Sequence, residues 1–149
     1  MELDPFLFSD EAVSEETREF NRELQEILRS MPTTHTQTPQ GVRDKRRRGG
    51  PPWGPVVHSD HAREVPIKGP GGDLVLRIID VGDSDGVYLQ LHGGGWVLGA
   101  ADLSDVGNEA IAREAGVTVV SVDYRLAPEH PYPAAIDNCW TAARWLIEN

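Results

Sequence analysis

Apolar residues near the N-terminus recur at the spacing of an α-helix. Four of them stand at positions i, i+4, i+7 and i+8 and so share one face: Phe20, Leu24, Ile27 and Leu28. Ser14 precedes two glutamates and can cap the free N–H groups of a first turn, while Pro32 cannot continue a helix. The pattern therefore predicts a surface helix between Ser14 and Pro32 with one buried face.

The next stretch, residues 32–60, shows neither helical nor strand periodicity. It is rich in Pro, Gly, Thr and Arg, which predicts a loop or mobile connection with at most a short helical turn. A basic run at residues 43–48 lies inside it, with five positive and one negative side chain. Short basic runs are found in nucleic-acid-binding segments, but they are common elsewhere, so we interpret this one as a solvated face of a mobile segment.

From residue 61 onward, short apolar runs alternate with helical patterns. Strands are predicted at residues 65–67, 74–79, 87–91 and 117–122, and a glycine-rich turn joins the first two. Helices are predicted around residues 103–111, closed by Gly116, and over residues 134–149. This alternation predicts an α/β fold with a parallel segment and a right-handed crossover.

The last predicted helix has an apolar side that should face the core. Six residues make up this side: Ile136, Cys139, Trp140, Ala143, Leu146 and Ile147. The helix is therefore expected to be amphipathic and to cover the sheet.

A glycine run follows the third predicted strand directly: His92-Gly93-Gly94-Gly95-Trp96. Consecutive glycines let the backbone approach a ligand closely and adopt conformations closed to other residues. Exposed backbone N–H groups can stabilise the oxyanion that forms when a nucleophile attacks an ester, and losing one such donor costs roughly 3–4 kcal/mol. A plain turn between strand and helix is the structural alternative.

A second motif stands further along the chain, Asp-Tyr-Arg-Leu-Ala-Pro-Glu at residues 123–129. With this spacing the two motifs resemble those of hormone-sensitive-lipase-type carboxylesterases, and the chain is similar to their N-terminal half. The resemblance implies an incomplete α/β-hydrolase fold, with an N-terminal cap helix and the first strands and helices of the central sheet. It also implies two parts, residues 1–60 as cap helix and irregular connection, and residues 61–149 as the N-terminal half of the catalytic domain, which would end before the nucleophile elbow.

The same resemblance assigns roles to the loop residues. The oxyanion donors correspond to backbone N–H groups within Gly93, Gly94 and Gly95, most often the latter two, and His92 holds the shape of the loop. Structural roles are expected for four residues of the second motif and its neighbourhood: Asp123, Arg125, Glu129 and His130.

The nucleophile of this family lies in a Gly-Asp-Ser-Ala-Gly elbow, which the sequence does not contain, and the family's acid and histidine follow that elbow. Residues 82–86 match Gly-x-Ser-x-Gly around Ser84, but an elbow needs a strand before it and a helix after it. A strand follows here, so we interpret residues 82–86 as a hairpin turn. The chain alone is therefore expected to be inactive and to supply only the oxyanion loop.

Complete members of the family hydrolyse small-molecule carboxylic esters by a serine mechanism without metal or organic cofactor. We expect the same reaction class and no cofactor here. A non-catalytic relative that binds a small ligand is one alternative, and an amidase is another, because the same oxyanion hole serves both carbonyl types.

The composition of the chain limits the kinds of partner that it is expected to bind. The formal net charge is 14 − 24 = −10, which disfavours binding to nucleic acid or to an anionic membrane. No apolar stretch is long enough to span a bilayer, and the single cysteine, Cys139, favours a reducing compartment, so a cytoplasmic protein is expected. Three histidines, His35, His58 and His61, are expected to be solvated, and no residues show metal-ligand spacing. The oligomeric state is left open.

Overall fold

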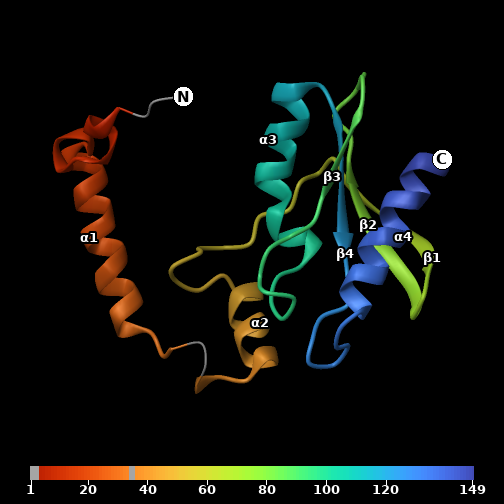
Figure 1. Cartoon of the computed structure of the whole chain (residues 1–149), viewed down its shortest axis with the longest axis horizontal. Helices are drawn as coiled ribbons and strands as arrows, with labels where there is room; N and C mark the ends of the chain where they lie inside the picture. The colour runs from red at the N-terminus through yellow and green to blue at the C-terminus, as the bar shows by residue number, and fades with distance from the viewer. Residues whose placement is uncertain (1–3, 34–35) are drawn as a thin grey trace.

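A computed structural model describes residues 4–33 and 36–149 of the chain. Within these residues a four-stranded mixed sheet has a helix on each face, and further helices precede it (Figure 1). This arrangement is the incomplete α/β fold predicted from the sequence.

The strands are β1 (Ala62–Gly69), β2 (Gly72–Ile79), β3 (Val87–Gln90) and β4 (Thr118–Asp123), so all four predicted strands are confirmed. They lie in the order β1-β2-β4-β3. β1 and β2 form an antiparallel hairpin, β4 pairs antiparallel with β2, and β3 runs parallel to β4. Because β4 separates β2 from β3, residues 82–86 form a loop between non-adjacent strands, and the predicted hairpin turn there is wrong.

Side chains alternate between the two faces of the sheet, and each face has its own core. Residues of α4 (Ala134–Glu148) pack on Leu76, Ile78, Val120 and Val122 on one face. On the other face α3 (Asp105–Ala115) places Ala112 against Ile79 and Val119. The 3₁₀ turn η4 (Ala101–Ser104) precedes α3. Gly116 ends α3 in the left-handed conformation at φ 64°, as the sequence predicts.

The predicted inward face of α4 is wrong for three of its six residues. Ile136, Trp140 and Ile147 are exposed to 44%, 66% and 86%. The buried residues of the helix are small or of medium size, namely Ala134, Ala135, Asn138, Cys139 and Ala142, and the partly buried Trp145 and Leu146 pack beside them. Apolar residues lie on more than one side of this helix, and periodicity alone does not show which side meets the sheet.

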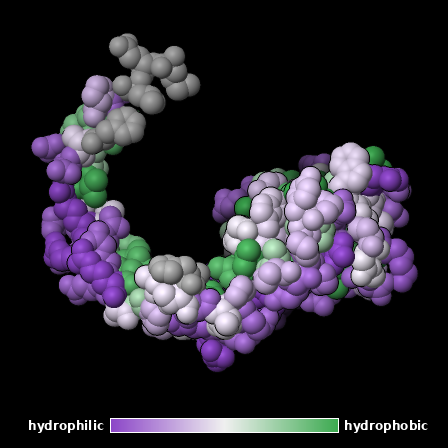
Figure 2. Space-filling model, turned by 60° about the horizontal axis from the view of Figure 1, so that its bottom comes forward, coloured by the Kyte–Doolittle hydropathy of each residue, from purple (hydrophilic) through white to green (hydrophobic). Residues whose placement is uncertain are grey.

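The N-terminal helix α1 (Glu15–Ser30) forms as predicted, and the Ser14 hydroxyl accepts a hydrogen bond from the Thr17 N–H at 3.2 Å. Two 3₁₀ turns precede it, η1 (Pro5–Phe8) and η2 (Asp10–Ala12). The predicted buried face is wrong, because none of the residues described in α1 is buried and Phe20 is 62% exposed. The helix lies away from the sheet in Figure 1. Figure 2 shows hydrophobic residues along the concave side of the N-terminal part of the chain that contains α1.

The segment predicted to be irregular contains a nine-residue helix, α2 (Pro39–Arg47). The Thr38 hydroxyl caps it by accepting from the Gly41 N–H at 3.1 Å, and proline occupies the first turn. Thr-Pro is a helix-start signal, which the surrounding breaker residues obscured. Val42 is buried in the described structure, so α2 is a packed element.

Candidate active site

The glycine loop leaves the end of β3 and turns sharply. The carbonyl of Gly94 accepts hydrogen bonds from the N–H groups of Val97 and Leu98, at 3.2 and 2.9 Å. Gly94 has a φ of 129°, and a Cβ there would lie 2.2 Å from the carbonyl oxygen of Leu98. Only glycine fits this position, because any side chain would meet backbone that cannot move aside cheaply.

The backbone N–H groups of the loop are unused. Residues 93–96 are exposed, and within the described part of the chain no hydrogen bond involves the N–H of Gly93, Gly94 or Gly95. Donors fixed by a turn and left without an acceptor are arranged to receive an oxygen from outside the chain.

Trp96 holds the far side of the turn in a strained conformation. Its φ of 64° is the only positive value at a non-glycine position among the described residues. This costs about 1–2 kcal/mol for a residue with a Cβ. The Trp96 carbonyl accepts from the Ala127 N–H at 2.8 Å, and its ring lies 5.6 Å from that of Tyr124. The second motif therefore stabilises the strained residue.

His92 anchors the start of the loop. Its side chain is 6% exposed, and Nδ1 lies 3.0 Å from the Gly93 carbonyl oxygen, to which it donates. The Tyr124 hydroxyl donates to the His92 carbonyl, and the two rings stack. Burial raises the pKa of Tyr124 to about 12, so this phenol is neutral and able to donate at ordinary pH.

Arg43 from α2 joins the glycine loop to the second motif. Its guanidinium donates to the carbonyls of Val97 and Ala127 at 2.8 and 2.7 Å and forms a bidentate pair with Glu129. The side chain is 14% exposed, so the predicted solvated, mobile character of the basic run is wrong at this residue. Hydrogen bonding to Arg43 lowers the pKa of the Glu129 carboxyl.

The remaining residues expected to be structural make structural contacts, with one exception. Asp123 accepts from the Ala101 N–H at 3.2 Å, and Arg125 donates twice to the Asn138 side chain at 3.0 Å. His130 is exposed, and its side chain has no partner among the residues described. Three of the four residues, Asp123, Arg125 and Glu129, thus make contacts that support the structural expectation.

A buried ion pair lies under η4 and α3, and the sequence did not reveal it. Arg77 of β2 binds the Asp105 carboxylate through two nitrogens, with Nε at 2.7 Å, and the Ser59 N–H donates to the same carboxylate. Hydrogen bonding to Asp105 raises the pKa of Arg77. Asn108 donates to Ser121 beside it at 2.8 Å. Alternation along β2 places Arg77 on the α3 face, a signal that sequence reasoning could have used.

Ser84 lies at the wrong end of the sheet to act with the glycine loop. It precedes β3, whereas His92 follows it, and a strand of four residues spans roughly 13 Å. The hydroxyl instead lies 2.9 Å from that of Thr118. The structure therefore supports the prediction that Ser84 is not a nucleophile beside this loop.

His58 and His61 are exposed, as predicted, whereas His35 lies outside the described residues. In the part of the chain that the structure covers, no group of three or more His, Cys, Asp or Glu side chains could hold a metal ion. None of the helices described combines the length and apolar character needed to cross a membrane.

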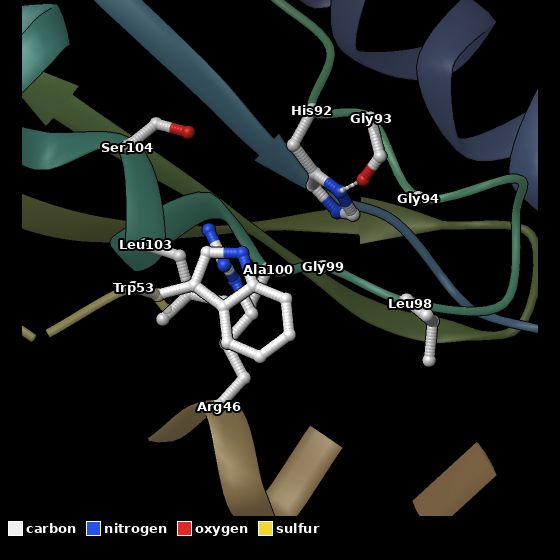
Figure 3. Close-up of a pocket in the computed structure, with 10 residues that line it drawn as sticks. All are labelled: Arg46, Trp53, His92, Gly93, Gly94, Leu98, Gly99, Ala100, Leu103 and Ser104. Atoms are coloured by element: carbon white, nitrogen blue, oxygen red, sulfur yellow. Dashed lines mark hydrogen bonds between the residues drawn. The ribbon is translucent and has the colours of Figure 1, made fainter. Parts of the chain in front are cut away.

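Pockets border the glycine loop on both sides. One of about 340 Å³ lies between His92, Gly94 and the residues of α2 and η4 (Figure 3). Another of about 360 Å³ lies between Gly95, Trp96 and the start of α4. A group bound at the loop can therefore extend to either side.

Comparison with known proteins agrees with this geometry. Residues 88–149 match a family described by the α/β-hydrolase fold. The chain is 56% identical to carboxylesterase NlhH of Mycobacterium tuberculosis over 69 residues, 46% of this chain and 22% of the relative. It is 43% identical to esterase LipI of the same organism over 104 residues, 66% of this chain and 32% of the relative.

Among solved structures, the chain is similar to the hyperthermophilic esterase of the archaeon Pyrobaculum calidifontis. The TM-score is 0.71 and the identity 29%, over 92% of this chain and 44% of that one. The chain spans less than half the length of each of these three proteins. Its motifs, its sheet order and these similarities support an α/β-hydrolase fold and a relation to the N-terminal part of the hormone-sensitive-lipase-type carboxylesterases.

Proposed function

We propose that this chain supplies the oxyanion-binding loop of an enzyme that hydrolyses small-molecule carboxylic esters by a serine mechanism. One observation carries the proposal: the exposed N–H groups of Gly94 and Gly95 have no acceptor within the described residues and sit in a turn that only glycine permits. The esterase relatives support the same reaction class.

In this reaction a serine oxygen adds to the ester carbonyl carbon, and the electron pair of the C=O bond moves to the carbonyl oxygen. The resulting oxyanion accepts hydrogen bonds from Gly94 and Gly95 more strongly than the neutral carbonyl does. Collapse expels the alcohol, which takes up the serine proton through a histidine, and water then releases the acid from the acyl-enzyme. The mechanism requires neither metal nor organic cofactor.

The residues of this chain divide the work of the loop. The backbone N–H groups of Gly94 and Gly95 donate hydrogen bonds to the oxyanion, and Gly93 separates them from His92. His92 fixes the start of the loop through its contacts with Gly93 and Tyr124. In this proposal residues 61–149 belong to the catalytic domain and residues 1–60 to a cap. No residue of residues 1–149 is assigned as nucleophile, acid or base, so the chain alone is proposed to be inactive.

The test joins residues 1–149 to the remaining part of carboxylesterase NlhH and follows release of p-nitrophenol from short acyl esters. The chimaera should turn over, and the unfused chain should not exceed a heat-denatured control. Gly94→Ala in the chimaera should lower kcat by about 10²-fold or more because the turn that positions the donors is lost. Gly93→Ala is the matched control, because a Cβ there meets nothing within 4 Å.

Two results would overturn the proposal. One is turnover by the unfused chain that Ser84→Ala abolishes, which would make Ser84 a nucleophile. The other is a folded Gly94→Ala chimaera with unchanged kcat. A parallel series of p-nitroanilides separates ester from amide preference, and a folded chimaera inactive on both would favour a ligand-binding role.

A further inference from the structure

The pocket between the glycine loop, α2 and η4 contains polar groups that the proposed oxyanion loop does not use. Its walls combine apolar and polar surface, and none of the residues that line it is acidic. Three side chains bring polar atoms to it from separate segments: Arg46 of α2, His92 of the loop and Ser104 of η4 (Figure 3). Convergence of a few polar groups on an apolar pocket is typical of a small-molecule site.

Arg46 is the cation of this pocket. Its guanidinium carbon lies 4.9 Å from the centre of the Trp53 ring, and the side chain is only partly exposed. Two neighbouring arginines of α2 are paired, Arg43 with Glu129 and Arg47 with Asp102. Within the described residues the Arg46 side chain has no carboxylate partner and donates no hydrogen bond. In a chain of net charge −10, this guanidinium is therefore free to bind an anion from outside.

His92 and Ser104 add two further unused atoms. Because His92 Nδ1 donates to the Gly93 carbonyl, the neutral ring presents Nε2 as an acceptor, and this buried atom has no partner among the described residues. Figure 3 shows the His92 ring directed from the loop into the pocket. Ser104 precedes α3, yet its hydroxyl forms no capping bond and is available to donate.

We propose that this pocket is a carboxylate-binding subsite beside the oxyanion loop, so that the preferred esters carry a free carboxylate. Arg46 binds the carboxylate over the face of Trp53, and the Ser104 hydroxyl donates to it. His92 Nε2 accepts a hydrogen bond from the ligand or from a water that the ligand orders. The apolar side chains of Leu98 and Leu103 contact the carbon chain between carboxylate and ester.

The substrate preference inferred from this subsite rests on the proposed function. The binding of a carboxylate to the subsite can be tested without catalysis. Residues 1–149 are titrated with monomethyl glutarate, a half-ester, and with dimethyl glutarate, its neutral counterpart. Chemical shifts of the Trp53 indole N–H and of the Gly93 and Gly94 amides report binding at the pocket. The half-ester should bind at least about tenfold more tightly, because an Arg–carboxylate pair is among the strong hydrogen-bonding interactions. Equal binding of the two esters to the unmodified chain would overturn the subsite.

Substitutions test which positively charged side chain binds the carboxylate. Arg46→Gln should remove the preference for the half-ester, whereas Arg48→Gln should keep it, because Arg48 does not line the pocket although it lies in the same basic run. Ser104→Ala should weaken half-ester binding and leave diester binding unchanged. Inorganic phosphate completes the series, and phosphate binding as tight as that of the half-ester would mean a general anion site and contradict the proposal.

The chimaera with NlhH separates the two proposals. If it hydrolyses neutral p-nitrophenyl esters while the chain binds half-ester and diester equally, the subsite fails and the esterase function stands. If it is folded and hydrolyses no ester while half-ester binding still depends on Arg46, the esterase function fails and the carboxylate site stands.

Discussion

The ring of His92 stacks on the ring of Tyr124, with centroids 4.0 Å apart and planes 9° from parallel. The first residue belongs to the glycine motif and the second to the motif at residues 123–129. The Tyr124 hydroxyl also donates to the His92 carbonyl, so the side chain of one motif fixes both ring and backbone of the other. The two motifs thus form one structural unit at the ends of β3 and β4.

Tyr124→Phe should leave the buried His92 carbonyl without its donor and destabilise the fold by about 1–3 kcal/mol. Because the pKa of Tyr124 is raised to about 12 from 10.0, the neutral phenol stabilises the folded chain fully below pH 10 and loses this effect as pH rises through 12. Absorbance at alkaline pH should show a phenolate transition near pH 12 that is missing in Tyr124→Phe. An unchanged alkaline titration in the variant would contradict the assignment.

Alanine substitutions of the three loop glycines should rank by the space and the backbone conformation at each position. Gly93→Ala should stay within about 0.5 kcal/mol of the unmodified chain. Gly95→Ala should cost about 1–2 kcal/mol, since its φ is 62° but space is open. Gly94→Ala should cost the most, because its Cβ would meet the Leu98 carbonyl. Urea unfolding of the three variants checks the order, and a Gly93→Ala variant less stable than Gly94→Ala would refute it.

The Arg77–Asp105 pair should dominate the polar contribution to stability on the α3 face. Asp105→Asn leaves a mostly buried guanidinium without its charge partner and should cost about 3–5 kcal/mol. Arg77 also contacts Glu64 at 3.4 Å, but that carboxylate is largely exposed. Glu64→Gln is therefore the control and should change the free energy of unfolding by less than about 1 kcal/mol. Similar losses in the two variants would argue against a special role for the buried pair.

Glu129 should make the junction between α2 and the second motif sensitive to acid. Hydrogen bonding to Arg43 lowers its pKa from the ordinary 4.5, so its contribution to stability is present above pH 4.5 and is lost as pH falls through the lowered value. In Arg43→Met, an NMR titration should show the Glu129 pKa moved upward. Arg48→Gln removes a nearby charge that does not contact Glu129 and should leave this pKa in place; equal shifts in both variants would mean a general charge effect.

Sequence patterns predicted the elements whose signals are local and unambiguous. The β-branched run predicted at residues 117–122, the Ser14 cap and the Gly116 stop each depend on neighbours in the chain, and the structure has a strand over 118–123 and both helix ends as expected. The glycine motif was located together with the strand that precedes it.

What the sequence did not reveal depends on partners distant in the chain. Arg43 reads as one charge in a basic run until the fold brings the carbonyls of Val97 and Ala127 to it. Trp140 and Cys139 both suit a buried helix face, and only the packing of α4 shows that the small residue faces the sheet. The apolar stripe of α1 likewise predicts a partner surface, which no described part of this chain provides.

The position of β4 between β2 and β3 has a consequence for synthesis on the ribosome. β1 and β2 can pair as soon as both have emerged, but β3 has no neighbour until the residues of β4, which follow α3, have also left the exit tunnel. The glycine loop after β3 rests on Tyr124 and Ala127, which emerge later still. A nascent chain halted before residue 118 would therefore contain the β1–β2 hairpin but not the folded glycine loop. The N–H groups of Gly94 and Gly95 would reach their final positions only after residues 118–127 have emerged.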